Sequence, residues 1–203
     1  MFPPGGIAPK QRGLIWSARY ALPSADIGIE AHITPEDANM GYGGVGDNDV
    51  LYSEAAVISK DQTTGTIRFD VATSHLQTAI ASDGKKTVTT HQAGIGDFVL
   101  NPATSDGKDL VVTLLTNIHG KFQARFVAVD KNGMPMTANE TSSQATNGQM
   151  NEITARFYNM SLNQIQQIRY EMRPYDLFVE FQNVSLVPGK HTNVQIEYGN
   201  SIN

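Results

Sequence analysis

An acidic triplet that follows a glycine-rich run is the first candidate for chemistry in this sequence. Asp47, Asn48 and Asp49 come directly after the run Gly41-Tyr42-Gly43-Gly44-Val45-Gly46. Carboxylate and amide oxygens are the ligands that calcium prefers, so these three residues form a candidate calcium site. Their spacing does not match the EF-hand loop, and a flexible surface loop is the alternative interpretation. The same acidic residues would repel phosphate, which argues against a phosphate-cradling glycine loop.

Two further groups of residues could bind a ligand. Tyr42, in the glycine-rich run, is the best candidate for an exposed aromatic ring that stacks on a sugar, because most other aromatic residues of a β domain fill its core. Asp130 and Asn132 also offer oxygen atoms to calcium, although the chemistry of a hairpin turn is the favoured explanation of this pair. Together with the acidic triplet, these residues define where we expect a small ligand or an ion.

Recognisable catalytic patterns are missing from the sequence. It contains no cysteine, which excludes disulfides, thiolate metal sites and cysteine nucleophiles. Its five histidines are isolated, without the His-Glu-x-x-His spacing of a helical zinc site, and no Gly-x-Ser-x-Gly elbow marks a nucleophilic serine. We therefore expect a protein without enzymatic activity and without a cofactor, calcium being the one possible exception.

Composition and charge limit the possible partners. The 203 residues carry a formal net charge of −5, and Lys85-Lys86 is the one adjacent basic pair. A nucleic-acid binder needs a basic face that displaces counterions from phosphates, so we expect no nucleic-acid partner. Hydrophobic residues make up 40% of the chain, enough for a packed core, but no apolar run approaches the length of a membrane span. We expect no direct membrane insertion of this segment.

Period-two alternation of apolar and polar residues is the main structural signal. Ile67, Phe69 and Val71 alternate with polar neighbours, as in a strand with one buried face. Similar patterns predict strands at 14–20, 26–33, 50–58, 85–91, 109–116, 122–129, 151–158, 166–172, 177–182 and 191–198. Turn dipeptides separate many of them, as in a sandwich. We predict an all-β fold, a single β-sandwich of jelly-roll or immunoglobulin type over 14–203, preceded by a Pro/Gly-rich linker or lead at 1–13.

Three local predictions complete the fold. The segment Asp130-Lys131-Asn132-Gly133 predicts a hairpin turn after a long strand. Ser161 is placed to cap one short helix near 161–167. The stretches 34–49 and 137–150 are rich in small and polar residues, and we expect both to be surface loops.

The C-terminal third carries a more specific pattern. The stretch from Arg173 to Leu186 reads Arg-Pro-Tyr-Asp-Leu-Phe-Val-Glu-Phe-Gln-Asn-Val-Ser-Leu. It resembles a domain at the C-terminal, extracytoplasmic end of bacterial membrane-anchored regulatory proteins, which include beta-lactam-sensor-type metallopeptidase receptors and sigma- or anti-sigma-like proteins. The chain departs from that pattern at Asp176-Leu177-Phe178, where an aromatic residue, often tryptophan, is expected before the Val-Glu-Phe.

The resemblance implies a sensor or interaction domain without catalytic residues of its own. It adds Arg173 and Tyr175 to the binding candidates. A physical reading of the motif pairs Arg173 with Glu180, or lets either cap a strand end, while Tyr175 and Phe181 pack.

We expect a non-enzymatic binding or sensory module of an extracytoplasmic bacterial protein, in the periplasm or at the cell surface, tethered through its N-terminal side to the rest of that protein. Its partner would be a protein or a small ligand. One alternative is a structural subunit of a surface layer, filament or particle, which requires self-association through an apolar patch or an open edge strand. The other alternative is a carbohydrate-binding module, which requires exposed coplanar aromatic residues.

Overall fold

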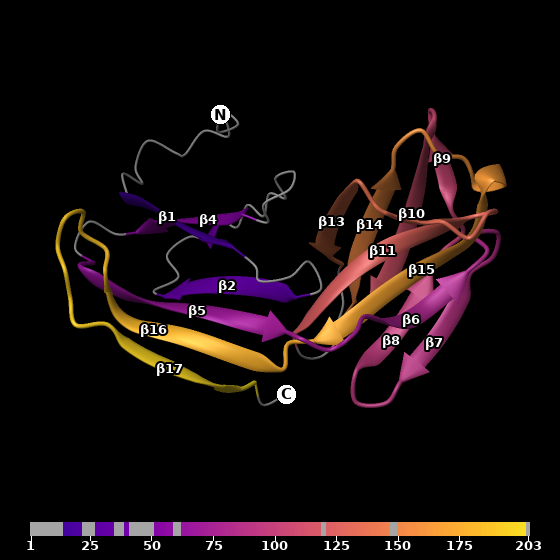
Figure 1. The fold of residues 1–203 in the computed structure, drawn as a ribbon. Coiled ribbons are helices and arrows are strands. Elements are labelled where there is room, and N and C mark those ends of the chain that lie inside the picture. Colours follow the sequence, from indigo (N-terminus) through magenta and orange to yellow (C-terminus); the bar gives the residue numbers. More distant parts are fainter. Residues whose placement is uncertain are drawn as a thin grey trace. The chain divides into compact units, whose positions relative to one another are not determined.

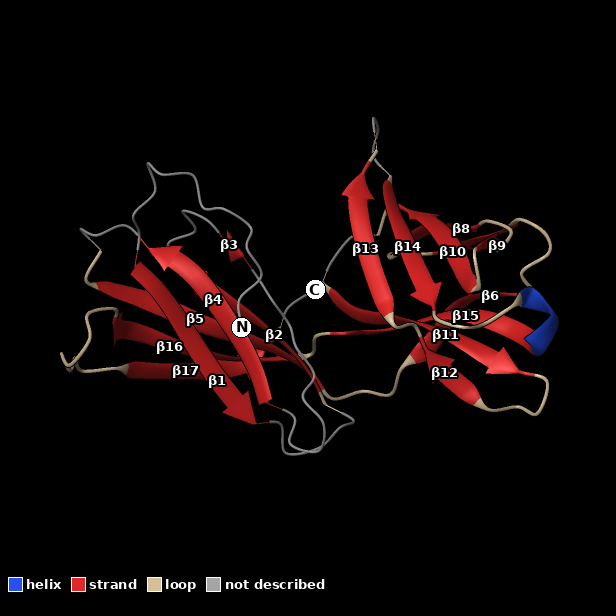
Figure 2. Ribbon diagram, turned by 90° about the horizontal axis from the view of Figure 1, so that it is seen from above, coloured by secondary structure: helices blue, strands red, loops and turns tan. Residues whose placement is uncertain are grey.

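The computed structural model describes residues 14–21, 27–34, 39–40, 51–58, 62–118, 121–146 and 150–201. All strand pairs among these residues are antiparallel, and the helical structure within them is a single 3-10 turn (Figure 2). The predicted all-β, sandwich-like fold class is therefore confirmed. Within the same residues, no helix has the length and the apolar character that a membrane crossing needs.

The chain divides into two compact units, one inserted into the other. Unit 1 comprises residues 1–73 and 175–202, and unit 2 comprises residues 74–174. Figure 1 shows the indigo-to-purple and the yellow ends of the sequence together in unit 1, with the magenta-to-orange middle in unit 2. The domain predicted over 14–203 therefore contains two compact units, and the lead predicted at 1–13 lies outside the described residues. Strands with alternating apolar and polar residues occur in both units, so the sequence pattern could not reveal the boundary between the units.

The described residues of unit 1 form two antiparallel sheets. One has the order β17-β16-β5-β2, and the other has the order β1-β4-β3. Their bounds are β1 (Leu14–Ala21), β2 (Gly28–Thr34), β3 (Asn39–Met40), β4 (Leu51–Ile58), β5 (Thr64–Ala72), β16 (Leu177–Ser185) and β17 (Gln195–Asn200). In the four-stranded sheet, Phe69 of β5 packs edge-to-face on Phe181 of β16, with ring centroids 6.0 Å apart. The predicted alternation thus gives this sheet one apolar and one polar face.

Unit 2 is a sandwich of two sheets, which Figure 2 shows as separate layers. The first sheet has the order β13-β14-β10-β8-β7, with β9 also paired to β10, and the second has the order β12-β11-β15-β6. Their bounds are β6 (Gln77–Ser82), β7 (Val88–Gln92), β8 (Gly96–Leu100), β9 (Thr104–Asp106), β10 (Asp109–Thr116), β11 (Phe122–Asp130), β12 (Pro135–Thr137), β13 (Glu140–Ala145), β14 (Asn151–Phe157) and β15 (Ile165–Pro174).

The core of unit 2 lies between these two sheets. Phe98, Phe126 and Phe157 are completely buried, one from each of β8, β11 and β14. Phe126 stands directly opposite Tyr170 of β15, and their ring centroids are 4.9 Å apart. Large apolar side chains from both sheets therefore interlock, as expected for a β-sandwich.

The structure confirms the predicted hairpin turn and shortens the predicted helix. The turn at 130–133 is confirmed: β11 pairs with β12, and Gly133 has a φ of 84°, a left-handed conformation that glycine adopts without strain. The helix predicted near 161–167 is a single turn, η1 (Leu162–Gln164). It ends there because Ile165 already has an extended backbone, with φ −100° and ψ 141°, and begins β15.

The loop expected at 137–150 contains a strand. All six residues of β13 are exposed, yet they pair in register with β14 from Glu140 opposite Arg156 to Ala145 opposite Asn151. An exposed edge strand needs no apolar face, so its sequence lacks the alternation that would have predicted it. Within the loop expected at 34–49, residues 39–40 form β3, and residues 35–38 and 41–49 lie outside the described residues.

Candidate functional site

The acidic triplet cannot be placed. Tyr42, Asp47, Asn48 and Asp49 all lie outside the described residues, so their calcium and binding roles stay predictions. In the part of the chain that the structure does describe, no group of three or more histidine, aspartate or glutamate side chains is arranged to hold a metal ion.

Arg173 and Tyr175, the two candidates from the C-terminal motif, are both buried. The Arg173 guanidinium donates from Nε to Gln123 Oε1 at 2.6 Å and from Nη1 to the Ser74 carbonyl at 2.7 Å. Arg173 also lines a hollow of about 270 Å³ in unit 2. The motif's glutamate, Glu180, lies in unit 1 and is 4.0 Å from Arg68. Through these contacts, Arg173 links the last strand of unit 2 to Ser74, the first residue of that unit.

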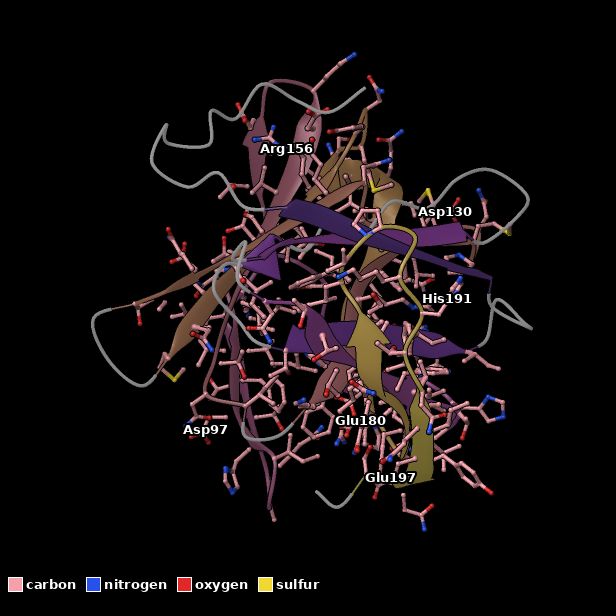
Figure 3. The ribbon with its side chains drawn as sticks, turned by 90° about the vertical axis from the view of Figure 1, so that its left-hand side faces the viewer. Asp97, Asp130, Arg156, Glu180, His191 and Glu197 are labelled. Atoms are coloured by element: carbon pink, nitrogen blue, oxygen red, sulfur yellow. The ribbon has the colours of Figure 1, made fainter. Side chains whose placement is uncertain are left out.

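A charged row crosses the polar face of the four-stranded sheet in unit 1. His32, Arg68, Glu180 and Glu197 stand opposite one another on consecutive strands. Gln182 bridges the two glutamates, donating to Glu180 at 2.8 Å and to Glu197 at 3.2 Å. Figure 3 shows both labelled glutamates on the yellow strands β16 and β17.

Buried Asp70 anchors the cationic side of this row. Its carboxylate accepts from Arg68 Nε at 2.8 Å and lies 3.2 Å from His32 Nε2. The Arg68 guanidinium also lies 4.3 Å from the centre of the Phe178 ring. The Arg68 cation is thus paired with Asp70, and Gln182 holds the Glu180 and Glu197 carboxylates together, so these side chains are engaged with one another across the sheet.

The larger hollow of unit 2 is the better candidate site. It has a volume of about 470 Å³, and we call it the Tyr158 hollow. Its walls are the β11–β12 turn and the connection from β14 to β15, which meet where the Lys131 N–H donates to the Gln164 carbonyl at 3.1 Å. Amide side chains line much of it: Asn132, Asn159, Asn163 and Gln164. The other lining residues are Asp130 and Lys131, with Met136, Tyr158 and Met160 as the less polar part.

Tyr158 is held in place at both ends. Its backbone N–H donates to Asn139 Oδ1 at 2.8 Å, and its hydroxyl forms a hydrogen bond with the Glu140 carboxylate, which raises the pKa of the phenol. The side chain nevertheless remains 43% exposed. An accessible aromatic ring therefore lies beside the amide groups.

The hairpin turn holds the carboxylate of Asp130, a residue labelled in Figure 3. Its Oδ1 accepts from the backbone N–H groups of Asn132 and Met134, each at 2.8 Å. These bonds, that from Met134 foremost, lower the pKa of Asp130, so the group is a carboxylate at neutral pH. Asp130 contributes one negative charge to the lining and Lys131 one positive charge, which leaves the hollow close to neutral.

Sequence reasoning found only part of this hollow. It identified Asp130 and Asn132 as oxygen donors and predicted their turn, but it did not select Tyr158 or Asn163. Their segments are more than twenty residues apart in the sequence, and no spacing pattern links them. No family model, curated protein or solved structure matches the sequence. The chemistry of the hollow is therefore the basis for proposing its function.

Proposed function

We propose that this chain is a non-enzymatic binding module and that the Tyr158 hollow binds a neutral, hydroxyl-rich ligand, namely a carbohydrate. The observation that carries the proposal is an exposed aromatic ring beside four amide side chains in a hollow whose lining carries one positive and one negative charge. This proposal unites the expected binding module with the expected carbohydrate-binding alternative.

The chemistry of the lining favours sugars over other small ligands. A tyrosine ring offers a flat apolar surface to the C–H face of a pyranose. Side-chain amides both donate and accept, and so match hydroxyl groups, which do the same. Met136 and Met160 add adaptable apolar contact. A volume of about 470 Å³ lies within the usual range of small-molecule sites.

The exposed coplanar aromatic residues expected for a carbohydrate-binding module are not the basis of this proposal. Among the residues whose side chains the structure describes, the exposed tyrosines are Tyr158 in unit 2 and Tyr198 in unit 1. The proposal depends instead on one ring at the rim of a hollow, a geometry suited to a short saccharide or the end of a longer one.

The same hollow argues against hydrolysis of a bound sugar. Glycoside hydrolysis uses a pair of carboxyl groups, one of them with a raised pKa that lets it act as the acid. Asp130 is the carboxylate among the residues that line the hollow, and its pKa is lowered. A group that is ionised and engaged by the turn is a poor general acid, which supports binding without catalysis.

The sequence resemblance supplies the cellular setting of the proposal. The Arg173–Leu186 motif is similar to domains of bacterial membrane-anchored regulatory proteins. A saccharide site in such a module would lie outside the cytoplasm, where cell-wall and environmental glycans are found, and its occupancy would be the sensed signal.

The test is titration of the whole chain with a panel of neutral oligosaccharides built from glucose, mannose or N-acetylglucosamine, followed by NMR of the backbone amides. A sulfated oligosaccharide serves as the charged comparison. We expect saturable shifts confined to residues 130–136 and 158–164 with at least one neutral member. Failure of every neutral saccharide to bind at millimolar concentration would refute the proposal.

Two variants separate the ring from its hydroxyl. Tyr158→Ala removes the stacking surface and should weaken binding about tenfold. Tyr158→Phe keeps the ring, loses only the Glu140 hydrogen bond and should retain most of the affinity. Tyr198→Ala, which removes an exposed tyrosine in unit 1, is the matched control and should change nothing. An affinity that is unaffected by Tyr158→Ala would place the sugar elsewhere.

A further inference from the structure

The most exposed apolar side chains of the described residues include a row on the last strand of unit 1. Val194, just before β17, is 40% exposed, and Ile196 and Tyr198 within it are 62% and 79% exposed. Alternate residues of a strand share a face, so the three side chains point the same way. They extend the apolar face of β16, because Ile196 stands opposite Phe181 and Tyr198 opposite Val179.

This row lies on an open edge. Among the described strands β17 pairs with β16 alone, and it ends the sheet order β17-β16-β5-β2. Proteins usually protect such an edge with lysine, proline, a bulge or a very short strand. The strand Gln195–Asn200 contains neither lysine nor proline, and its pairing with β16 runs from Gln195 to Asn200 without a shift in register. Glu197 is the one charged residue of the strand, so most of its length is open to the addition of another strand.

The sequence of this edge is complementary to itself in an antiparallel register that uses the whole exposed row. With a two-fold axis through Ile196, Ile196 faces its own copy, Val194 faces Tyr198, and Gln195 faces Glu197. Residues opposite one another in an antiparallel pair share a face, so apolar side chains meet apolar ones and an amide meets a carboxylate. An axis through Glu197 would set two carboxylates against each other, and an axis through Tyr198 would set Ile196 against Asn200.

We propose that two copies of this chain associate through β17, joining their four-stranded sheets in the register centred on Ile196. The contact is isologous, so each copy contributes the same residues and the assembly closes as a dimer. A single strand pair with a short apolar row is a small interface, so the association is weak and depends on concentration. The proposal involves unit 1 and stands independently of the Tyr158 hollow in unit 2.

Sedimentation velocity of the intact chain over about 1 μM to about 1 mM measures this association directly. We expect the wild type to pass from monomer to dimer within that range. Ile196→Lys places two ammonium groups face to face at the axis and should keep the chain monomeric. Met134→Lys replaces a 63% exposed methionine in unit 2 and is the matched control, which should dimerise like the wild type.

The register has its own test at residue 195. Gln195→Lys sets a cation against Glu197 of the other copy and should tighten the dimer several-fold. Gln195→Glu sets two carboxylates together and should weaken it several-fold, since the symmetry repeats each pair twice. Thermal unfolding of each variant checks that the monomer fold is intact, and Gln195→Lys keeps the test valid if Ile196→Lys fails to fold.

Three results would overturn the proposal. A wild-type chain that stays monomeric over the whole range excludes the dimer. A dimer that persists in a folded Ile196→Lys variant lies at another surface. Equal effects of Gln195→Lys and Gln195→Glu exclude the register centred on Ile196, because a non-specific apolar contact does not respond to the sign of the charge at this position.

Discussion

Tyr170 couples the stability of unit 2 to alkaline pH. Burial raises the pKa of its phenol from 10.0 to about 12, because the phenolate would lose its hydration in the core. A raised pKa in the folded state means that the stabilising contribution is complete below about 10 and is lost between about 10 and 12. We expect Tyr170→Phe to lose less stability than the wild type across this window. Urea unfolding at a series of pH values measures the difference, and parallel curves would contradict it.

The lowered pKa of Asp130 leads to the opposite prediction, a loss of turn stability at acidic pH. Its pKa is lowered by hydrogen bonds from the β11–β12 turn, chiefly from the Met134 N–H, so the contribution of the carboxylate is present above 3.8 and is lost as the pH falls through the lower folded value. We expect the Asn132 and Met134 amides to lose protection from hydrogen exchange in that acidic range. Asp130→Asn keeps an acceptor oxygen without the titration, so its turn should show no such acid dependence.

At the scale of elements, the β6–β7 connection contains a glycine that packing and backbone conformation both require. Gly84 has a φ of +77°, and a Cβ added there would lie 2.7 Å from Leu162 Cδ1 and 2.9 Å from Ile168 Cδ1. Gly107, in the β9–β10 turn, has a similar φ of +65° but nothing within 4 Å of the added Cβ.

These two turns therefore form a matched pair. Gly107→Ala introduces a side chain at a left-handed backbone position without any clash. It should lower the free energy of unfolding by about 1 kcal/mol. Gly84→Ala adds overpacking against two core side chains and should cost about 3 kcal/mol. Urea denaturation of both variants decides the point. Equal losses would mean that Leu162 and Ile168 move aside freely.

Strands were predictable where burial leaves an alternating pattern. Leu110, Val112 and Leu114 are completely buried and alternate with partly exposed neighbours, so the predicted strand 109–116 coincides with β10. β13 was missed because all of its residues are exposed, and β8 because only Phe98 and Leu100 alternate in a five-residue strand that begins with glycine. Alternation of apolar and polar residues indicates which strand faces are buried. It cannot predict an edge strand such as β13, which is exposed on both faces and is held by backbone pairing.

At the scale of the whole molecule, the missing information is the pairing of distant segments. β5 and β16 are neighbours in unit 1 although unit 2 lies between them in the sequence. The Tyr158 hollow likewise depends on the contact between Lys131 and Gln164. Alternation says that each strand has a buried face, but not which strand lies beside it, so the insertion and the hollow could not be predicted.

The insertion implies that residues 74–174 fold without the rest of the chain. Both sheets of the sandwich and its core lie inside this range, and its two ends are close together, since Arg173 donates to the Ser74 carbonyl and Met172 stands opposite Gln77. A segment whose ends meet can be excised without opening its core. We expect the 74–174 fragment to give well-dispersed NMR amide signals.

Two variants of this fragment, at Arg173 and at Phe126, show how much its stability depends on the contact between its ends and on its core. Arg173→Ala leaves the partly buried Ser74 carbonyl without this partner and should destabilise the fragment by about 1–3 kcal/mol. Phe126→Ala removes a completely buried ring and should lower the free energy of unfolding by about 3–5 kcal/mol, a large part of the stability of a small domain. A fragment with collapsed amide dispersion would show that unit 2 needs unit 1 to fold, and its autonomy would then be lost even though its core lies within its own sequence.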